Sequence, residues 1–82
     1  SNMTTKVVGA SVNVTTGNNV NSARVVRAFA SAATLVTVTT SADVTIGSFI
    51  MPANAVEFIE KNPTDKLVAN VALQCTPAAY AG

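Results

Sequence analysis

The side chains that could support catalysis are few in this sequence, and their types and spacing match no catalytic arrangement. The chain has a single cysteine, Cys75, and no histidine, so the commonest general base and the commonest metal ligand are missing. A cysteine becomes a nucleophile when a neighbouring base or positive charge lowers its pKa, and the sequence indicates no such partner. We expect Cys75 to be a buried, unreactive thiol, because it shares a strand face with Val71 and Leu73.

The carboxylates do not form an acid–base pair either. They are Asp43, Glu57, Glu60 and Asp65. Glu57 and Glu60 are three positions apart, so on a β-strand they would point to opposite faces. The four glycines are isolated and form no phosphate-binding motif. The sequence therefore predicts no catalytic residues, no cofactor-binding residues, no metal ligands and no cofactor, and we expect a protein that is not an enzyme.

Length and composition limit the remaining classes. With 82 residues one domain is expected, and Ser1 and Asn2 resemble an expression scar before an initiator Met3, which leaves residues 4–82 as a single β domain. Five basic and four acidic residues give a net charge of +1, so no basic patch indicates a nucleic-acid partner. No apolar run approaches the roughly 18 residues of a membrane span, and we expect no membrane partner.

Short stretches rich in Val and Thr indicate that the elements are β-strands. Turn residues recur roughly every 8–12 positions, which is typical of a sandwich or a small barrel. We expect an all-β fold: a small antiparallel β-sandwich or barrel, jelly-roll or Greek-key-like, with six to seven short strands. Outside the hairpin described next, the predicted strands are 6–14 with a bulge or a bend at Gly9, 23–29, 34–40, 44–51 and 78–80. In 44–51, one face carries Val44, Ile46 and Ile50, and the other carries Phe49 and Met51.

The clearest predicted unit is a β-hairpin whose arms are residues 56–61 and 67–75. Apolar and polar residues alternate along the second arm, and the first arm is expected to point Val56 and Phe58 inward. The sequence Asn-Pro-Thr-Asp at 62–65 predicts the turn, because proline presets φ for the second position of a type I turn. The charged residues near this turn are expected to lie in water.

Two observations indicate that the chain assembles with copies of itself. A domain of this size buries only about 60–65% of the surface that its unfolded chain exposes, so burial between subunits would add stability. Residues 28–42 carry no charge, which is typical either of a semi-polar sheet face or of a surface that packs on another subunit. Arg24 and Arg27 lie on opposite faces of the predicted strand 23–29, which indicates an edge strand or an interface. We expect a homo-oligomer, with a trimer favoured over a dimer.

Two stretches near the C-terminal end resemble a known class of proteins. Residues 47–65 read GSFIMPANAVEFIEKNPTD, and residues 72–80 read ALQCTPAAY. Both are similar to stretches of small virion structural proteins of tailed bacteriophages, of the capsid decoration or head-stabilising type, with an F-x-x-P-A…V-x-F-I-E-K-x-P-T-D stretch and an A-x-x-x-T-P-x-A-Y ending. The first 46 residues show no such resemblance. The resemblance implies an all-β structural protein that joins a capsid or tail assembly, and it implies no catalytic residues.

The residues and the resemblance together predict a non-enzymatic phage virion structural protein, made in the host cytoplasm and located in the virion. We expect a capsid decoration or stabilising protein that acts as an oligomer through protein–protein contacts, with itself and the major capsid or other virion proteins as partners. The alternative is a receptor- or carbohydrate-binding domain of a fibre or adhesin, which would expose aromatic rings. Phe29, Phe49 and Phe58 are expected in the core, which argues against that alternative.

Overall fold

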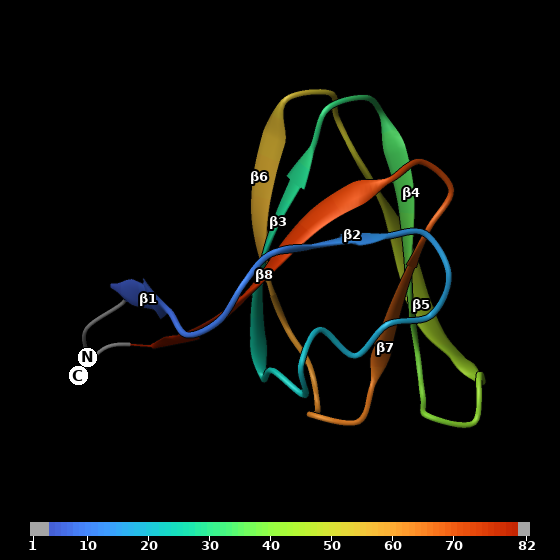
Figure 1. Ribbon diagram of the computed structural model, residues 1–82. Helices are drawn as coiled ribbons and strands as arrows, with labels where there is room; N and C mark the ends of the chain where they lie inside the picture. Colours follow the sequence, from blue (N-terminus) through green and yellow to red (C-terminus); the bar gives the residue numbers. More distant parts are fainter. Residues whose placement is uncertain (1–3, 81–82) are drawn as a thin grey trace.

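The structure is a computed structural model that describes residues 4–80, and the residues 1–3 that we interpret as a scar and initiator Met lie outside this range. The described residues form eight β-strands and no helix (Figure 1). The strands are β1 (Thr5–Val7), β2 (Val12–Val14), β3 (Val25–Ala30), β4 (Thr34–Thr39), β5 (Thr45–Met51), β6 (Ala55–Glu60), β7 (Lys66–Ala69) and β8 (Leu73–Tyr80).

The strands form two antiparallel sheets that pack face to face. One sheet has the order β1-β8-β3-β6, with β2 pairing along the same side of β8 as β1, and the other has the order β5-β4-β7. The chain crosses between the sheets from β3 to β4 and from β5 to β6, both at the top of Figure 1. The predicted antiparallel β-sandwich is confirmed, with eight strands in place of six to seven.

The hydrophobic core lies between the sheets and contains many small side chains. Because alternate residues of a strand point to one face, Val26, Ala28 and Ala30 of β3 are all buried. The larger buried side chains include Val36, Met51, Leu67, Leu73 and Cys75. The predicted burial of Cys75 is therefore confirmed. In a core this small, each of the few large side chains supplies much of the packing between the sheets.

The predicted hairpin between residues 56–61 and 67–75 is wrong, although its turn is present. β6 pairs with β3, and β7 pairs with β4, so the two arms belong to different sheets. The amide of Asp65 donates a hydrogen bond of 3.0 Å to the carbonyl oxygen of Asn62, which closes the turn. A proline-containing turn specifies that the chain reverses direction. It does not specify whether the two strands pair in one sheet or stack in two.

The first arm also faces the opposite way from the prediction. Val56 and Phe58 are exposed, and Ile59 is the buried residue of β6. In the antiparallel register Val56 lies opposite Phe29, and Phe58 lies opposite Arg27. These four residues share the outer surface of the sheet. The inward prediction is wrong because β6 turns its Val56–Phe58 face away from the second sheet.

Burial of Val71 and of the charged residues near the turn differs in part from the prediction. The chain leaves the sheet between β7 and β8, so Val71 is exposed although it alternates with core residues. Glu57 and Glu60 are exposed, as predicted for charges near the turn. The same prediction is wrong for Lys61 and Asp65, which are each 7% exposed.

β3 is a central strand, so of the two interpretations of the arginines, an edge strand or an interface, the edge strand is wrong and the interface stays a prediction. It pairs with β8 on one side and with β6 on the other. Arg24 precedes the strand and is exposed, and Arg27 is partly buried on the outer face. The charge-free residues 28–42 include the end of β3 and all of β4, which is the central strand of the other sheet. Burial within the domain accounts for part of this stretch, but residues 31–33, Leu35 and residues 41–42 are exposed without carrying a charge, so the subunit-packing interpretation stays a prediction.

The predicted separate strand at 78–80 is the end of β8, which continues through Pro77 without a turn. Proline has no amide hydrogen, so it needs a place where no strand partner requires one. Such a place exists between β1 and β2, where the chain bends at Gly9, as predicted. A Cβ on Gly9 would lie 2.8 Å from Pro77 Cγ. Glycine at position 9 therefore makes room for the proline ring.

Candidate functional site

The structure places several large apolar side chains on the outer surface of the sandwich. On the three-stranded sheet, Leu35 of β4 and Ile46 and Ile50 of β5 are 42%, 58% and 69% exposed. Leu35 lies directly opposite Ile50. A register shift between Val38 and Thr39 leaves Ile46 without a partner on β4, so Ile46 is placed on this surface by its exposure and not by alternation alone. We call the surface formed by these three residues the β4–β5 face. Neither β4 nor β5 contains a charged residue.

A second apolar surface lies on the outer side of the other sheet. It consists of Arg27, Phe29, Val56 and Phe58, and we call it the β3–β6 face. Phe58 is 47% exposed, while Phe29 is partly buried. The ring of Phe58 therefore stands opposite an arginine on an exposed sheet surface. Aromatic residues and arginine are both enriched at protein–protein interfaces.

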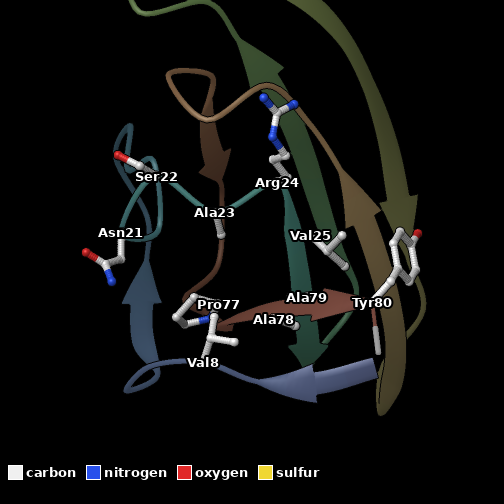
Figure 2. Close-up of a pocket in the computed structure, with 10 residues that line it drawn as sticks. All are labelled: Val8, Asn21, Ser22, Ala23, Arg24, Val25, Pro77, Ala78, Ala79 and Tyr80. Atoms are coloured by element: carbon white, nitrogen blue, oxygen red, sulfur yellow. The ribbon is translucent and has the colours of Figure 1, made fainter. Parts of the chain in front are cut away.

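An apolar pocket of about 340 Å³ lies between the loop that precedes β3 and the end of β8 (Figure 2). Its lining residues are Val8, Asn21, Ser22, Ala23, Arg24, Val25, Pro77, Ala78, Ala79 and Tyr80. Figure 2 shows Val8 and Pro77 together on one side of the pocket and the Tyr80 ring on the other. Of these ten residues only Arg24 is charged, and none is a carboxylate, a histidine or a cysteine. The lining therefore suits a ligand with an apolar group and a negative charge, which Arg24 could pair with.

The loop wall of this pocket has an uncommon backbone conformation. Val20, Asn21 and Ser22 have φ values of 52°, 56° and 57°, in the left-handed region that costs roughly 1–2 kcal/mol for a residue with a Cβ. Asparagine side chains support the loop: Asn18 Oδ1 accepts a hydrogen bond from the Val20 amide at 2.7 Å, and Asn19 Oδ1 accepts one from the Ser22 amide at 3.2 Å. Val20 is buried in the core, so the loop is anchored at its base.

Lys61 is a buried cation with a structural set of partners. Its Nζ donates hydrogen bonds to the carbonyl oxygens of Ala23 at 2.7 Å, Asn62 at 3.3 Å and Pro63 at 3.4 Å. Burial lowers the pKa of Lys61, and the nearby Asp65 carboxylate partly opposes that shift. These bonds tie the turn after β6 to the residues before β3. The ammonium group thus stabilises the fold.

Cys75 lies in an environment that keeps its thiol protonated. Its strand neighbours are Ala28 on one side and Val12 on the other, and neither can act as a base. Burial raises the pKa of the Cys75 thiol to about 11. Because the thiolate is the reactive form, the side chain is suited to packing.

The carboxylates do not gather at any point of the described structure. Asp43 forms an ion pair of 3.0 Å with Lys66 Nζ, while Asp65 Oδ2 accepts a hydrogen bond from the Asn62 amide. Among residues 4–80, no group of three or more histidine, cysteine, aspartate or glutamate side chains could hold a metal ion. Within the same range, no helix is long and apolar enough to cross a membrane.

The exposed apolar surfaces are the features that sequence reasoning missed. The alternation in 44–51 separates Ile46 and Ile50 from Phe49 and Met51, but both sets are apolar. Alternation therefore does not tell which set faces the core. The expectation that all three phenylalanines lie in the core is wrong for Phe58, which is exposed, and for Phe29, which is partly buried on the outer side of its sheet. It is confirmed for Phe49, which packs against the core. Glu57 lies opposite the buried Ala28, on the same side of β6 as the buried Ile59, so its alternation with Val56 and Phe58 favours the wrong orientation. A charge on the inner side is tolerated there because β6 is an edge strand.

Comparison with known proteins adds no relative: no protein-family model, no curated protein and no solved structure matches this chain.

Proposed function

We propose that this protein is a non-enzymatic structural protein of a bacteriophage virion, which decorates or stabilises the capsid through protein–protein contacts. The observation that carries the proposal is the β4–β5 face, where Leu35, Ile46 and Ile50 are exposed on two uncharged strands. The resemblance of residues 47–65 and 72–80 to small virion proteins supplies the biological setting.

The energetics of the β4–β5 face support binding to another protein. Fully burying one Ile or Leu side chain contributes roughly 1.5–3 kcal/mol, so three half-exposed side chains could contribute several kcal/mol against a partner. This domain leaves those side chains in water while it uses alanines in its core. Contiguous exposed apolar surface marks interaction sites, and depletion of charge is typical of interface cores.

The arrangement of two apolar surfaces supports a bridging role. The β4–β5 face and the β3–β6 face lie on the outer sides of different sheets, so they point away from each other. A rigid domain with two such faces can contact two neighbouring molecules at once. A protein that binds only the assembled shell shifts the equilibrium toward assembly. A specific contact of this kind is expected to bury about 1,200–2,000 Å² in total.

A receptor- or carbohydrate-binding domain of a fibre or adhesin is the second candidate. The exposure of Phe58 and Tyr80 favours this candidate, because exposed aromatic rings offer a large apolar contact surface and the tyrosine hydroxyl can also form a hydrogen bond. The two residues are separated within the sheet: β3 lies between their strands, and Phe58 is level with Thr76, four residues before Tyr80 on β8. Binding to glycans or to host cells that is lost in Phe58→Ser or Tyr80→Ser would favour this candidate over capsid decoration.

The test of the proposal compares phage particles made with and without this protein. We expect the protein to copurify with particles at a fixed ratio to the major capsid protein. We also expect particles that lack it to lose their contents at lower temperature or lower salt. Absence from purified particles, or equal survival of both kinds of particle, would refute the decoration function.

A further inference from the structure

The outermost strands of the two sheets differ in how they are protected against pairing with another chain. β1 contains Lys6, β6 contains Glu57 and Glu60, and β7 contains Lys66. β7 is also covered by backbone hydrogen bonds from residues 15–18. β5 has seven residues without charge or proline, and among the described strands it pairs only with β4. Charged side chains and short length commonly protect edge strands, and the uncharged edge strand β2 has only three residues. β5 is therefore the longest edge strand without a charge, and its one irregularity is the β-bulge at Ile46.

The sequence of β5 is complementary to itself when two copies run antiparallel about Ser48. A two-fold axis at Ser48 places Ile46 of one copy opposite Ile50 of the other, and the reverse. These side chains share a face with Leu35, so the two β4–β5 faces would join into one larger apolar surface. No charged residue would oppose another along the seven paired residues.

On the opposite face of β5, the same register brings complementary residues of the two copies together. Pairing about Ser48 places Gly47 of one copy opposite Phe49 of the other. A Cβ on Gly47 would meet no atom within 4 Å, so space is open there. Phe49 packs on the core but is only partly buried, because no strand lies beyond β5. Each Phe49 ring could therefore cover the glycine of the other copy, which is a recognised way of supporting glycine in a sheet.

We propose that a second copy of this chain occupies the β5 edge in this register, so that two three-stranded sheets become one continuous sheet. The inference rests on the proposed function and deepens it, because it names one partner and leaves the joined apolar surface for a virion protein. A two-fold contact closes as a dimer, in place of the trimer expected from sequence. The sheet β1-β8-β3-β6 of one copy is not expected to pair with the same sheet of the other copy, because its edge strand β6 carries Glu57.

The experiment measures the mass of the whole protein by sedimentation and light scattering, from about 1 µM to about 500 µM. Ser48→Lys and Ser48→Asp each place two like charges opposite one another at the axis, at a position that is exposed in the single chain. Gln74→Lys is the matched control, because it adds the same charge at an exposed position of β8 in the other sheet. Circular dichroism confirms that each variant is folded.

We expect the wild type and Gln74→Lys to form dimers with the same concentration dependence. Each Ser48 variant alone should dimerise at least about tenfold more weakly, and an equimolar mixture of the two variants should restore the dimer. A wild type that stays monomeric at the highest concentration, a trimer mass, or unchanged dimerisation of Ser48→Lys would overturn the inference. A monomeric protein that still binds particles would refute this inference alone and leave the proposed function standing.

Discussion

Ile50 and Met51 are adjacent in sequence but lie on opposite faces of β5, and this difference gives a direct test of the strand's orientation. Met51 is 0% exposed and Ile50 is 69% exposed. Replacing a fully buried methionine by alanine removes its packing and leaves a cavity, which costs about 2–5 kcal/mol. Ile50→Thr keeps a β-branched side chain on an exposed strand surface, so its cost should stay within about 0.5 kcal/mol.

Urea denaturation followed by circular dichroism measures both free energies of unfolding, at a concentration low enough for the chain to be monomeric. The slope for a domain this small is about 1 kcal/mol per M urea, so Met51→Ala should lower the midpoint by about 2 M or more. The midpoint of Ile50→Thr should move by about 0.5 M or less. Equal losses, or a larger loss for Ile50→Thr, would mean that β5 presents its other face to the core, as a slip of one residue would produce.

Three further predictions concern buried or closely packed groups. The pKa of Cys75 rises from 9.0 to about 11 on folding, so the folded state holds the thiol proton more tightly than the unfolded state does. The stability of the wild type relative to Cys75→Ala should therefore be constant below pH 9. It should fall by about 2–3 kcal/mol as the pH rises from 9 to 11. A pH-independent difference between the two proteins in urea denaturation would contradict this. Lys61→Met should cost about 1–3 kcal/mol, because the buried carbonyl oxygen of Ala23 loses its ammonium donor, and a neutral effect on the unfolding midpoint would show that Lys61 is solvated. Gly9→Ala should cost about 1–3 kcal/mol through the clash with Pro77, whereas Gly47→Ala should be within about 0.5 kcal/mol, and thermal unfolding that ranks the two in the other order would contradict the described contacts.

The sequence was sufficient for the fold class because its local patterns all indicate the same kind of element. β-branched residues, period-two alternation and regular turns predict short antiparallel strands, and the turn at 62–65 and the bend at Gly9 are both present. Burial of Cys75 also follows from its alternation with Leu73, although Val71 in the same pattern is exposed. Such properties depend on neighbours in sequence, so they can be read without knowing the partner strands.

Strand pairing could not be read in the same way. β6 and β7 are joined by a short turn, and a hairpin is the simplest connection between consecutive strands, yet each pairs with a strand far away in the sequence. The orientation of β6 then follows from its place at the edge of a sheet, where Val56 and Phe58 can lie outside. Pro77 is a similar case. Its ring fits inside β8 because Gly9, in the segment between β1 and β2, has no side chain at that point.

The candidate surface was hidden for a related reason. The exposed residues Leu35, Ile46 and Ile50 have the same composition as a core, and only the packing of the two sheets shows that they remain outside. Lys61 shows the opposite error: a charge beside a turn normally lies in water, so the sequence predicts an exposed side chain, whereas Lys61 is buried. Its burial depends on carbonyl oxygens of Asn62 and Pro63 in the turn and of Ala23 before β3.

The central claim is that the β4–β5 face binds a virion, and the most direct measurement is readdition of purified protein to particles that lack it. The bound amount is measured as a function of protein concentration for the wild type, for Leu35→Lys and for the control Thr64→Lys, which adds the same charge at an exposed position of the turn between β6 and β7. Leu35 lies on β4, away from the free β5 edge, so its replacement changes the face without changing the paired strand. We predict saturable binding of the wild type and of Thr64→Lys, and at least about tenfold weaker binding of Leu35→Lys. Equal binding of Leu35→Lys and the wild type, or no saturable binding of the wild type, would contradict the claim.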